Sequence, residues 1–228
     1  MFENKKFNEE TIWQLAHDML NGMKILHANK IIHRDIKSAN IFIVDGVAKL
    51  GDLNVSKVME GKFATTQTGT PYYTSPEIWN GRKYDFKCDI WSFGCLIYEL
   101  CQLRPPFMAK DFPALSRKVN TGYYEPISSK YSKKLSMLIK KCLTVDTTKR
   151  PTASELLNDE IFCEMGKTNE GDISLLDTIR CPKVLRMLNK QLPEKRSSKK
   201  LVTMKVILDE EEHRETPKVG RSLKKIKS

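Results

Sequence analysis

Apolar residues recur every three or four positions over the first predicted helix, which extends from Glu9 to Leu26. The residues that would share one face are Ile12, Leu15, Ala16, Met19, Met23 and Leu26. A second run, from Asp89 to Leu100, is apolar on almost every side. That pattern is typical of a helix buried at the centre of a helical domain.

Two short apolar runs separated by a turn signal predict a β-hairpin. The runs are Ile41 to Val44 and Val47 to Leu50, and Asp45-Gly46 between them is typical of a two-residue turn. The pattern as a whole therefore predicts a mainly α fold with one small β-hairpin.

Shorter segments with helical spacing follow the long apolar run. Leu135 to Leu143 and Thr152 to Leu157 are amphipathic, and Thr152-Ala153-Ser154-Glu155 fits a capping box. Residues Leu103 to Phe107 and Asp111 to Asn120 favour a loop and a surface helix, with a docking face as the alternative.

Polar residues suited to phosphate chemistry lie on both sides of the hairpin. Asp35, Lys37 and Asn40 precede it, and Asp52 follows twelve residues after Asn40. Carboxylate and amide oxygens suit Mg²⁺, while a lysine neutralises phosphate charge. A single Asp or Lys in a loop is usually a solvated charge, so the joint spacing carries the inference.

Five segments in a fixed order resemble the protein kinase family over residues 1–163. They are His33 to Asn40, Asp52-Leu53-Asn54, Ser75-Pro76-Glu77, Asp89 to Gly94 and Lys149 to Thr152. A lysine at the position of Lys37 is what a resemblance to serine/threonine kinases, rather than to tyrosine kinases, would imply. The run Gly69-Thr70-Pro71-Tyr72-Tyr73 further resembles the NIMA-related branch.

The resemblance implies a role for each polar residue. Asp35 would accept or orient the proton of a substrate Ser or Thr hydroxyl, and Lys37 would contact the transferred phosphoryl group. Asn40 and Asp52 would hold Mg²⁺ bridging the phosphates of ATP. Phe42 would lie beneath the adenine ring, although an ordinary core position fits the same residue.

Residues 55–74 resemble an activation segment, rich in hydroxyl side chains. By resemblance, Arg34 would bind a phosphate on this segment, and Thr66 matches the usual phosphorylation site. Thr65 and Thr68 are the competing sites, and a plain polar loop is a further alternative. Thr70 would bridge toward the catalytic Asp and Lys.

Three residues have structural roles implied by the same resemblance. Glu77 would pair with Arg150 in a buried contact, which is costly to break from one side. Asp89 would anchor the backbone of the catalytic loop.

The resemblance covers the C-terminal, large lobe of a kinase and not the small nucleotide-binding lobe. The sequence contains no glycine-rich phosphate loop, and Lys5 and Lys6 lie in no apolar strand. We therefore expect negligible kinase activity from this chain alone, explained by a fragment, an incomplete gene model or a shortened isoform. A non-catalytic interaction module built on a truncated kinase is the alternative.

Two segments follow the predicted lobe of residues 1–163. Residues 164–192 form a predicted helical extension, in which Pro182 divides Ser174 to Leu192 into two short helices. Residues 193–228 form a basic tail predicted to be disordered.

Composition adds limits on partners and environment. The formal net charge is +11, so the tail could bind an acidic partner, but it lacks the interleaved aromatics of a specific nucleic-acid site. The six cysteines form no Cys-x-x-Cys pair, which favours a reducing intracellular environment. No membrane-length apolar run or secretory signal appears, so we expect a cytoplasmic or nuclear protein that acts on protein substrates.

Overall fold

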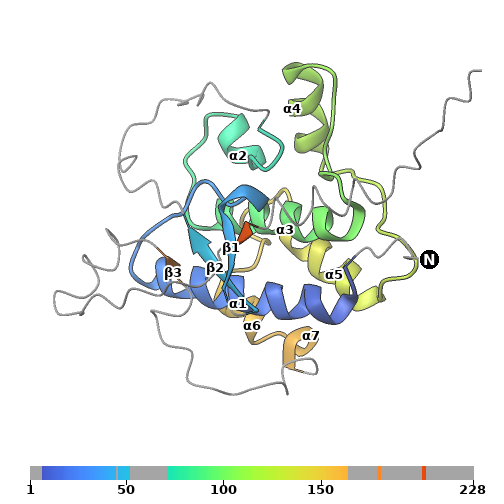
Figure 1. Cartoon of the computed structure of the whole chain (residues 1–228). Helices are drawn as coiled ribbons and strands as arrows, with labels where there is room; N and C mark the ends of the chain where they lie inside the picture. Colours follow the sequence, from blue (N-terminus) through green and yellow to red (C-terminus); the bar gives the residue numbers. More distant parts are fainter. Residues whose placement is uncertain (1–6, 45, 52–70, 164–178, 181–201, 204–228) are drawn as a thin grey trace, which may run out of the picture.

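The computed structural model describes residues 7–44, 46–51, 71–163, 179–180 and 202–203. Helix α1, Glu9–Ala28, crosses the whole molecule (Figure 1). Asn8 caps it, because its side chain accepts a hydrogen bond of 2.7 Å from the backbone N–H of Thr11. The apolar face predicted for this helix is buried, and the helix ends two residues beyond the predicted boundary.

Helix α3, Lys87–Gln102, is the buried central helix that its uniform apolar pattern predicted. It packs against α1 and against α5, Lys133–Cys142. Gly94 permits the close approach of α3 and α5, because a Cβ there would lie 2.6 Å from Cys142 Cβ. The structure therefore joins α1, α3 and α5 around one apolar core.

The predicted hairpin is confirmed. Strands β1, Ile41–Val44, and β2, Val47–Gly51, pair antiparallel with Ile41 opposite Leu50. Gly46, with φ of 82°, adopts the left-handed backbone conformation that such a turn requires.

Two short strands were not predicted. Strand β3, Ile179–Arg180, pairs parallel with β2, and β4, Val202–Thr203, pairs antiparallel with β1, so the sheet order is β3-β2-β1-β4. Ile179 and Arg180 thus lie in a strand rather than in a predicted helix, and Val202 and Thr203 form a strand within the tail, whose predicted disorder stays a prediction. The physical reason is that a two-stranded hairpin leaves two edges of unpaired N–H and C=O groups, which extended segments can satisfy.

The remaining helices are short. They are η1, Ser38–Asn40; α2, Pro76–Trp79; α4, Phe112–Thr121; α6, Ala153–Leu157; and α7, Glu160–Cys163. The capping box predicted at Thr152 and Glu155 is present, and α4 confirms the predicted surface helix. The helices η1, α2 and α7 were not predicted, because three or four residues are too few to show periodicity.

Four cysteines lie in the described core. Cys88, Cys95, Cys101 and Cys142 are buried and form no disulfide. Burial raises the pKa of the Cys88, Cys95 and Cys142 thiols, so these remain protonated at neutral pH. Among the described residues, every helix is too short or too polar to cross a bilayer.

Candidate functional site

Asp35, Lys37 and Asn40 meet in the loop between α1 and β1. Lys37 Nζ lies 2.9 Å from Asp35 Oδ2, and Asn40 Nδ2 donates to the same oxygen at 2.9 Å and to the Asp35 carbonyl at 2.8 Å. The Asp35 side chain is 35% exposed. The structure therefore brings together three of the predicted site residues around one solvent-accessible carboxylate.

The buried carboxylate of Asp89 holds the backbone of this loop. Asp89 accepts hydrogen bonds from the backbone N–H groups of His33 and Arg34, both at 2.8 Å, and its Oδ2 lies 3.0 Å from His27 Nε2. Arg34 has φ of 66°, an unfavourable conformation for a residue with a Cβ. The contacts from Asp89 hold this turn, which orients the next residue, Asp35.

His33 is a site residue whose role the sequence did not reveal. Its side chain is fully buried, and Nδ1 lies 3.4 Å from the backbone N of Asp35. Burial lowers the pKa of His33, against the raising effect of the Asp89 and Asp35 charges. The imidazole is therefore neutral at neutral pH. In the sequence, the one indication of a role for His33 was its position at the start of the His33 to Asn40 segment.

Tyr73 connects the segment before α2 to Ser38, in the loop between α1 and β1, and to Glu99 on α3. Its hydroxyl donates to Glu99 Oε2 at 2.6 Å and lies 3.4 Å from Ser38 Oγ, while Ser92 Oγ donates to its carbonyl at 2.8 Å. Burial raises the pKa of Tyr73 far above its ordinary value, so the hydroxyl remains a donor. Sequence reasoning missed this contact because Glu99 and Tyr73 are 26 positions apart.

Phe42 lies on β1 with its side chain half-buried. Its ring covers Gly51, since a Cβ at Gly51 would lie 2.1 Å from Phe42 Cε2. The register pairs Ile41 with Leu50, so the chain leaves β2 at the end of the hairpin where Asn40 enters β1. The predicted residues Asp52, Thr66 and Thr70 lie outside the described residues.

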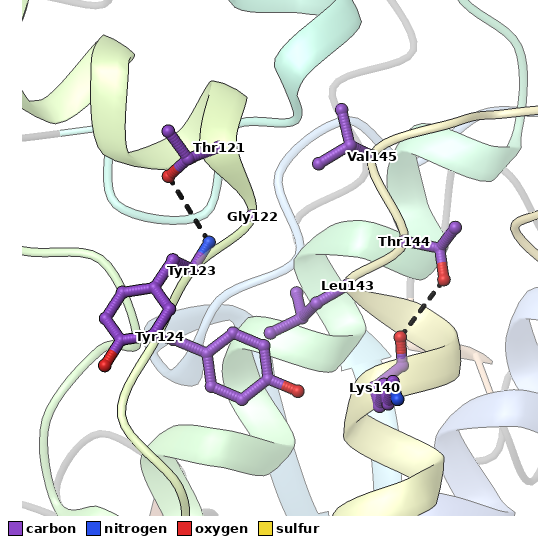
Figure 2. A pocket seen from close by; sticks show the side chains of 8 residues that line it. All are labelled: Thr121, Gly122, Tyr123, Tyr124, Lys140, Leu143, Thr144 and Val145. Carbon is purple, nitrogen blue, oxygen red and sulfur yellow. Dashed lines mark hydrogen bonds between the residues drawn. The ribbon is translucent and has the colours of Figure 1, made fainter.

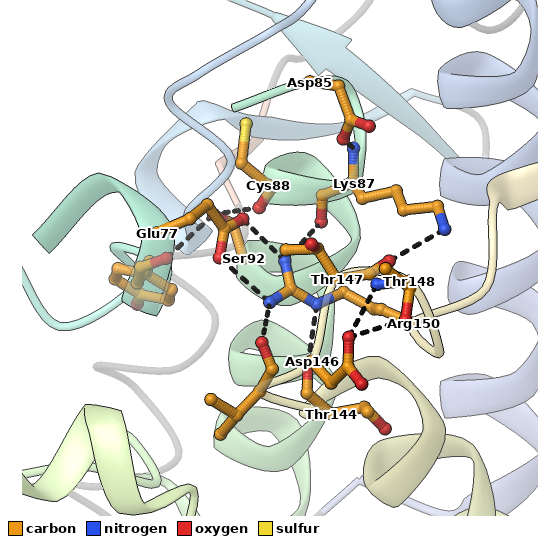
Figure 3. A network of polar contacts seen from close by, with 12 residues as sticks. Glu77, Asp85, Lys87, Cys88, Ser92, Thr144, Asp146, Thr147, Thr148 and Arg150 are labelled. Carbon is orange, nitrogen blue, oxygen red and sulfur yellow. Dashed lines mark hydrogen bonds and ion pairs between the residues drawn. The ribbon is translucent and has the colours of Figure 1, made fainter. Parts of the chain in front are cut away.

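Glu77 and Arg150 form the predicted pair, and Figure 3 shows the network around it. The two guanidinium nitrogens Nη1 and Nη2 donate to Glu77 Oε1 and Oε2 at 2.8 and 3.0 Å. Arg150 also donates to the carbonyls of Thr144 and Lys87, both at 2.9 Å, and its guanidinium carbon lies 5.0 Å from the ring centroid of Trp91. Burial would raise the pKa of Glu77, but the contacts from Arg150 lower it overall.

The contacts with Asp35 orient the Asn40 side chain. Its amide nitrogen is used in both bonds to Asp35, so Oδ1 is the atom of this amide that is chemically suited to bind a cation. Within the described part of the chain, no group of three or more His, Cys, Asp or Glu could hold a metal by itself. A Mg²⁺ ion at Asn40 would therefore need further ligands, such as Asp52 or nucleotide phosphates.

Comparison with known proteins agrees with the kinase resemblance of the sequence motifs. Residues 1–162 match the protein kinase domain family. The chain is 42% identical over 160 residues to the probable serine/threonine-protein kinase nek2 of Dictyostelium discoideum, covering 68% of this chain and 38% of that protein. It is 48% identical over 142 residues to the G2-specific protein kinase nim-1 of Neurospora crassa, covering 61% of this chain and 17% of that protein.

Proposed function

This chain belongs to the protein kinase domain family, and we propose that it carries the catalytic loop of a NIMA-related serine/threonine kinase. The reaction is transfer of the γ-phosphate of ATP to Ser or Thr of protein substrates. The observation that carries the proposal is the Asp35, Lys37 and Asn40 cluster on a loop anchored by Asp89.

In this proposal each polar side chain acts at a defined point. Asp35 orients the substrate hydroxyl and accepts its proton through the exposed part of its carboxylate. Lys37 is placed 2.9 Å from that carboxylate and neutralises charge on the transferred group. Phe42 forms the floor of the adenine site.

Asn40, together with Asp52, would hold Mg²⁺ on the nucleotide. The ion would supply neutralisation of phosphate charge when bound. Orientation of the Asn40 amide by Asp35 supports this assignment, because the oxygen is the atom left available.

The proposed domain organisation is a kinase large lobe over residues 1–163, followed by the extension of residues 164–192 and the basic tail of residues 193–228. The sequence holds no glycine-rich phosphate loop, so the lobe needs a nucleotide-binding lobe to transfer phosphate. The second candidate function is a non-catalytic interaction module.

A fusion experiment separates the two functions. We expect no ATP-dependent transfer to a Ser/Thr peptide library by the 228-residue chain, but clear transfer when it follows the nucleotide-binding lobe of a NIMA-related kinase. Asp35→Asn in the fusion should reduce kcat by about 100-fold or more, because it removes the proton acceptor. The exposed Lys110→Ala is the matched control and should leave kcat unchanged. A folded fusion that stays inactive would favour the interaction module.

Regulation through the activation segment is part of the proposal. Arg34 is half-buried, with its guanidinium carbon 5.3 Å from the Tyr84 ring centroid, and it directly precedes Asp35. A phosphate on Thr66 would bind this cation and order the segment, with Thr70 completing the substrate site. Thr66→Ala should lower the activity of the fusion, whereas Thr65→Ala and Thr68→Ala should not.

A further inference from the structure

Two neighbouring hollows lie on the surface beside α4, away from the residues assigned to phosphoryl transfer. The first encloses about 540 Å³ between α2 and the loop after α5, and is lined in part by Asn80, Arg82 and Lys83. The second encloses about 350 Å³ and is lined in part by Tyr123 and Leu143 (Figure 2). Val145 lines both, so we call the two hollows together the α4 groove.

Local geometry holds the two hollows in place. Helix α4 ends at Gly122, which has φ of 65°, and a Cβ there would lie 2.7 Å from Val145 Cγ2. Asn80 Nδ2 donates to Asn120 Oδ1 at 2.6 Å, which joins the end of α2 to α4. Thr144 Oγ1 donates to the Lys140 carbonyl at 3.1 Å. The groove therefore has walls formed by helix ends that hydrogen bonds tie together.

The charges of the α4 groove are unbalanced. Arg82, Lys83 and Lys140 are exposed and form no ion pair with any other described residue. The two carboxylates of the groove are already engaged: Glu77 by Arg150, and Asp146 by Thr148 and by Lys149 at 3.7 Å. The groove thus presents three exposed cations against one partly exposed carboxylate, that of Asp146, which is 47% exposed.

Exposed apolar surface lies beside these cations. Tyr123 is 75% exposed and Val145 is 37% exposed. Burial raises the pKa of Tyr124 to about 12, so its hydroxyl remains neutral and able to donate a hydrogen bond. The exposed Tyr123 and the half-buried Tyr124, next to exposed cations, match a peptide that is acidic and carries an apolar anchor.

We propose that the α4 groove binds an acidic segment of a partner protein. A carboxylate of the segment contacts Arg82 and Lys83, and an aromatic or aliphatic side chain packs on Tyr123, Tyr124 and Leu143. This goes beyond phosphoryl transfer, because the groove uses none of the catalytic-loop residues.

The test is a selection from a displayed random peptide library on the full 228-residue chain. We expect the selected peptides to be enriched in Asp and Glu together with one aromatic or aliphatic residue. Binding of the selected peptides, measured by fluorescence anisotropy, should weaken as salt rises, because charge attraction is screened. Selection of neutral or basic peptides, or of none, would overturn the proposal.

Charge-reversal variants locate the binding site. Arg82→Glu/Lys83→Glu should weaken binding of the selected peptides by about tenfold or more, and Tyr123→Ser should weaken it as well. Lys110→Glu/Lys133→Glu is the matched control, since both lysines are exposed and line neither hollow. Equal binding by the groove variant and the control would overturn the assignment. Circular dichroism checks folding, and Arg82→Ala/Lys83→Ala replaces the reversal if that variant unfolds.

Discussion

At the scale of single residues, the most constrained groups are charged side chains that the fold has removed from water. Arg150 is fully buried, and Glu77 is 6% exposed. Every contact of the guanidinium is with a carboxylate, a carbonyl or an aromatic face. Such a group stabilises the fold only while its partners remain, because an unpaired buried charge is costly.

Removing Arg150 should therefore destabilise the lobe strongly. We expect Arg150→Ala to lower the free energy of unfolding by about 3–5 kcal/mol, because Glu77 is left buried without its partner. Urea unfolding followed by circular dichroism measures this. The neighbouring Lys149→Ala is the control and should change it by less than about 0.5 kcal/mol, because Lys149 is exposed. A similar loss in both variants would contradict the role given to the pair.

Asp18 is a second buried carboxylate, and its pKa is shifted in the opposite direction to that of Glu77. Its Oδ2 accepts from the backbone N–H of Ala48 at 2.9 Å, and its Oδ1 accepts from Gln14 Nε2 at 3.1 Å. Burial raises the pKa of Asp18 from its ordinary 3.8 despite these hydrogen bonds. Ionisation is thus easier in the unfolded chain than in the fold.

The stability of the wild type relative to Asp18→Asn should fall as pH rises from about 3.8 through the higher pKa of the folded state. Urea unfolding at a series of pH values checks the sign. Asp159→Asn is the opposing control, because the hydrogen bond from Lys141 lowers the pKa of Asp159. There the wild type should gain stability relative to the variant as pH rises. The same slope for both substitutions would show that the burial argument is wrong.

At the scale of elements, the β1–β2 hairpin depends on a close contact between a ring and a glycine. Phe42 covers Gly51, and Asp18 ties β2 to α1 through the backbone of Ala48. The hairpin thereby fixes the positions of Asn40 and of the chain leading to Asp52. A change in this contact should affect both stability and the geometry of the site.

Gly51→Ala should lower the free energy of unfolding by about 1–3 kcal/mol, because the new methyl group overlaps the Phe42 ring. The added substitution Phe42→Leu should recover part of the loss, giving a coupling energy in a double-mutant cycle. Denaturant unfolding of the wild type, the two single variants and the double variant supplies that energy. Additive effects would show that Phe42 and Gly51 are not in contact.

At the scale of the whole molecule, the buried apolar core of the described residues lies between Ile12 and Phe162. The described residues beyond Cys163 contribute two short strands at the edges of the hairpin. The kinase domain match ends at residue 162, at the end of the same core. The core thus coincides with the domain to which the family assignment applies.

A form ending at residue 163 should keep a single cooperative unfolding transition. Its free energy of unfolding should fall by about 2 kcal/mol or less, because the described residues that it lacks contribute the strand pairings of β3 and β4. A form ending at Thr152 should lose much more, because it lacks α6, which packs on α1, and Phe162, whose ring centroid lies 5.1 Å from that of Trp13. Chemical denaturation of the three forms tests this. Loss of cooperativity in the form ending at residue 163 would mean that the tail belongs to the domain.

The local pattern of the sequence determined much of the fold. Periodicity located α1 and α5, a uniformly apolar run located α3, and the Asp45-Gly46 turn signal located the hairpin, because neighbouring residues decide these features. The ordered motifs indicated the kinase family and the NIMA-related branch, both of which the comparisons confirm. The functions assigned to the individual site residues stay predictions.

The tertiary structure alone decided how distant residues meet. The resemblance implied that Asp89 anchors the loop 55 positions before it, but the left-handed backbone of Arg34 and the contact of Tyr73 with Glu99 across 26 positions appear only in the fold. The strands β3 and β4 have no periodic signal and form because the hairpin edges offer unpaired backbone groups. The unbalanced charge of the α4 groove likewise arises where α2, α4 and the loop after α5 converge. Sequence spacing records which residues are close along the chain, whereas only packing decides which are close in space.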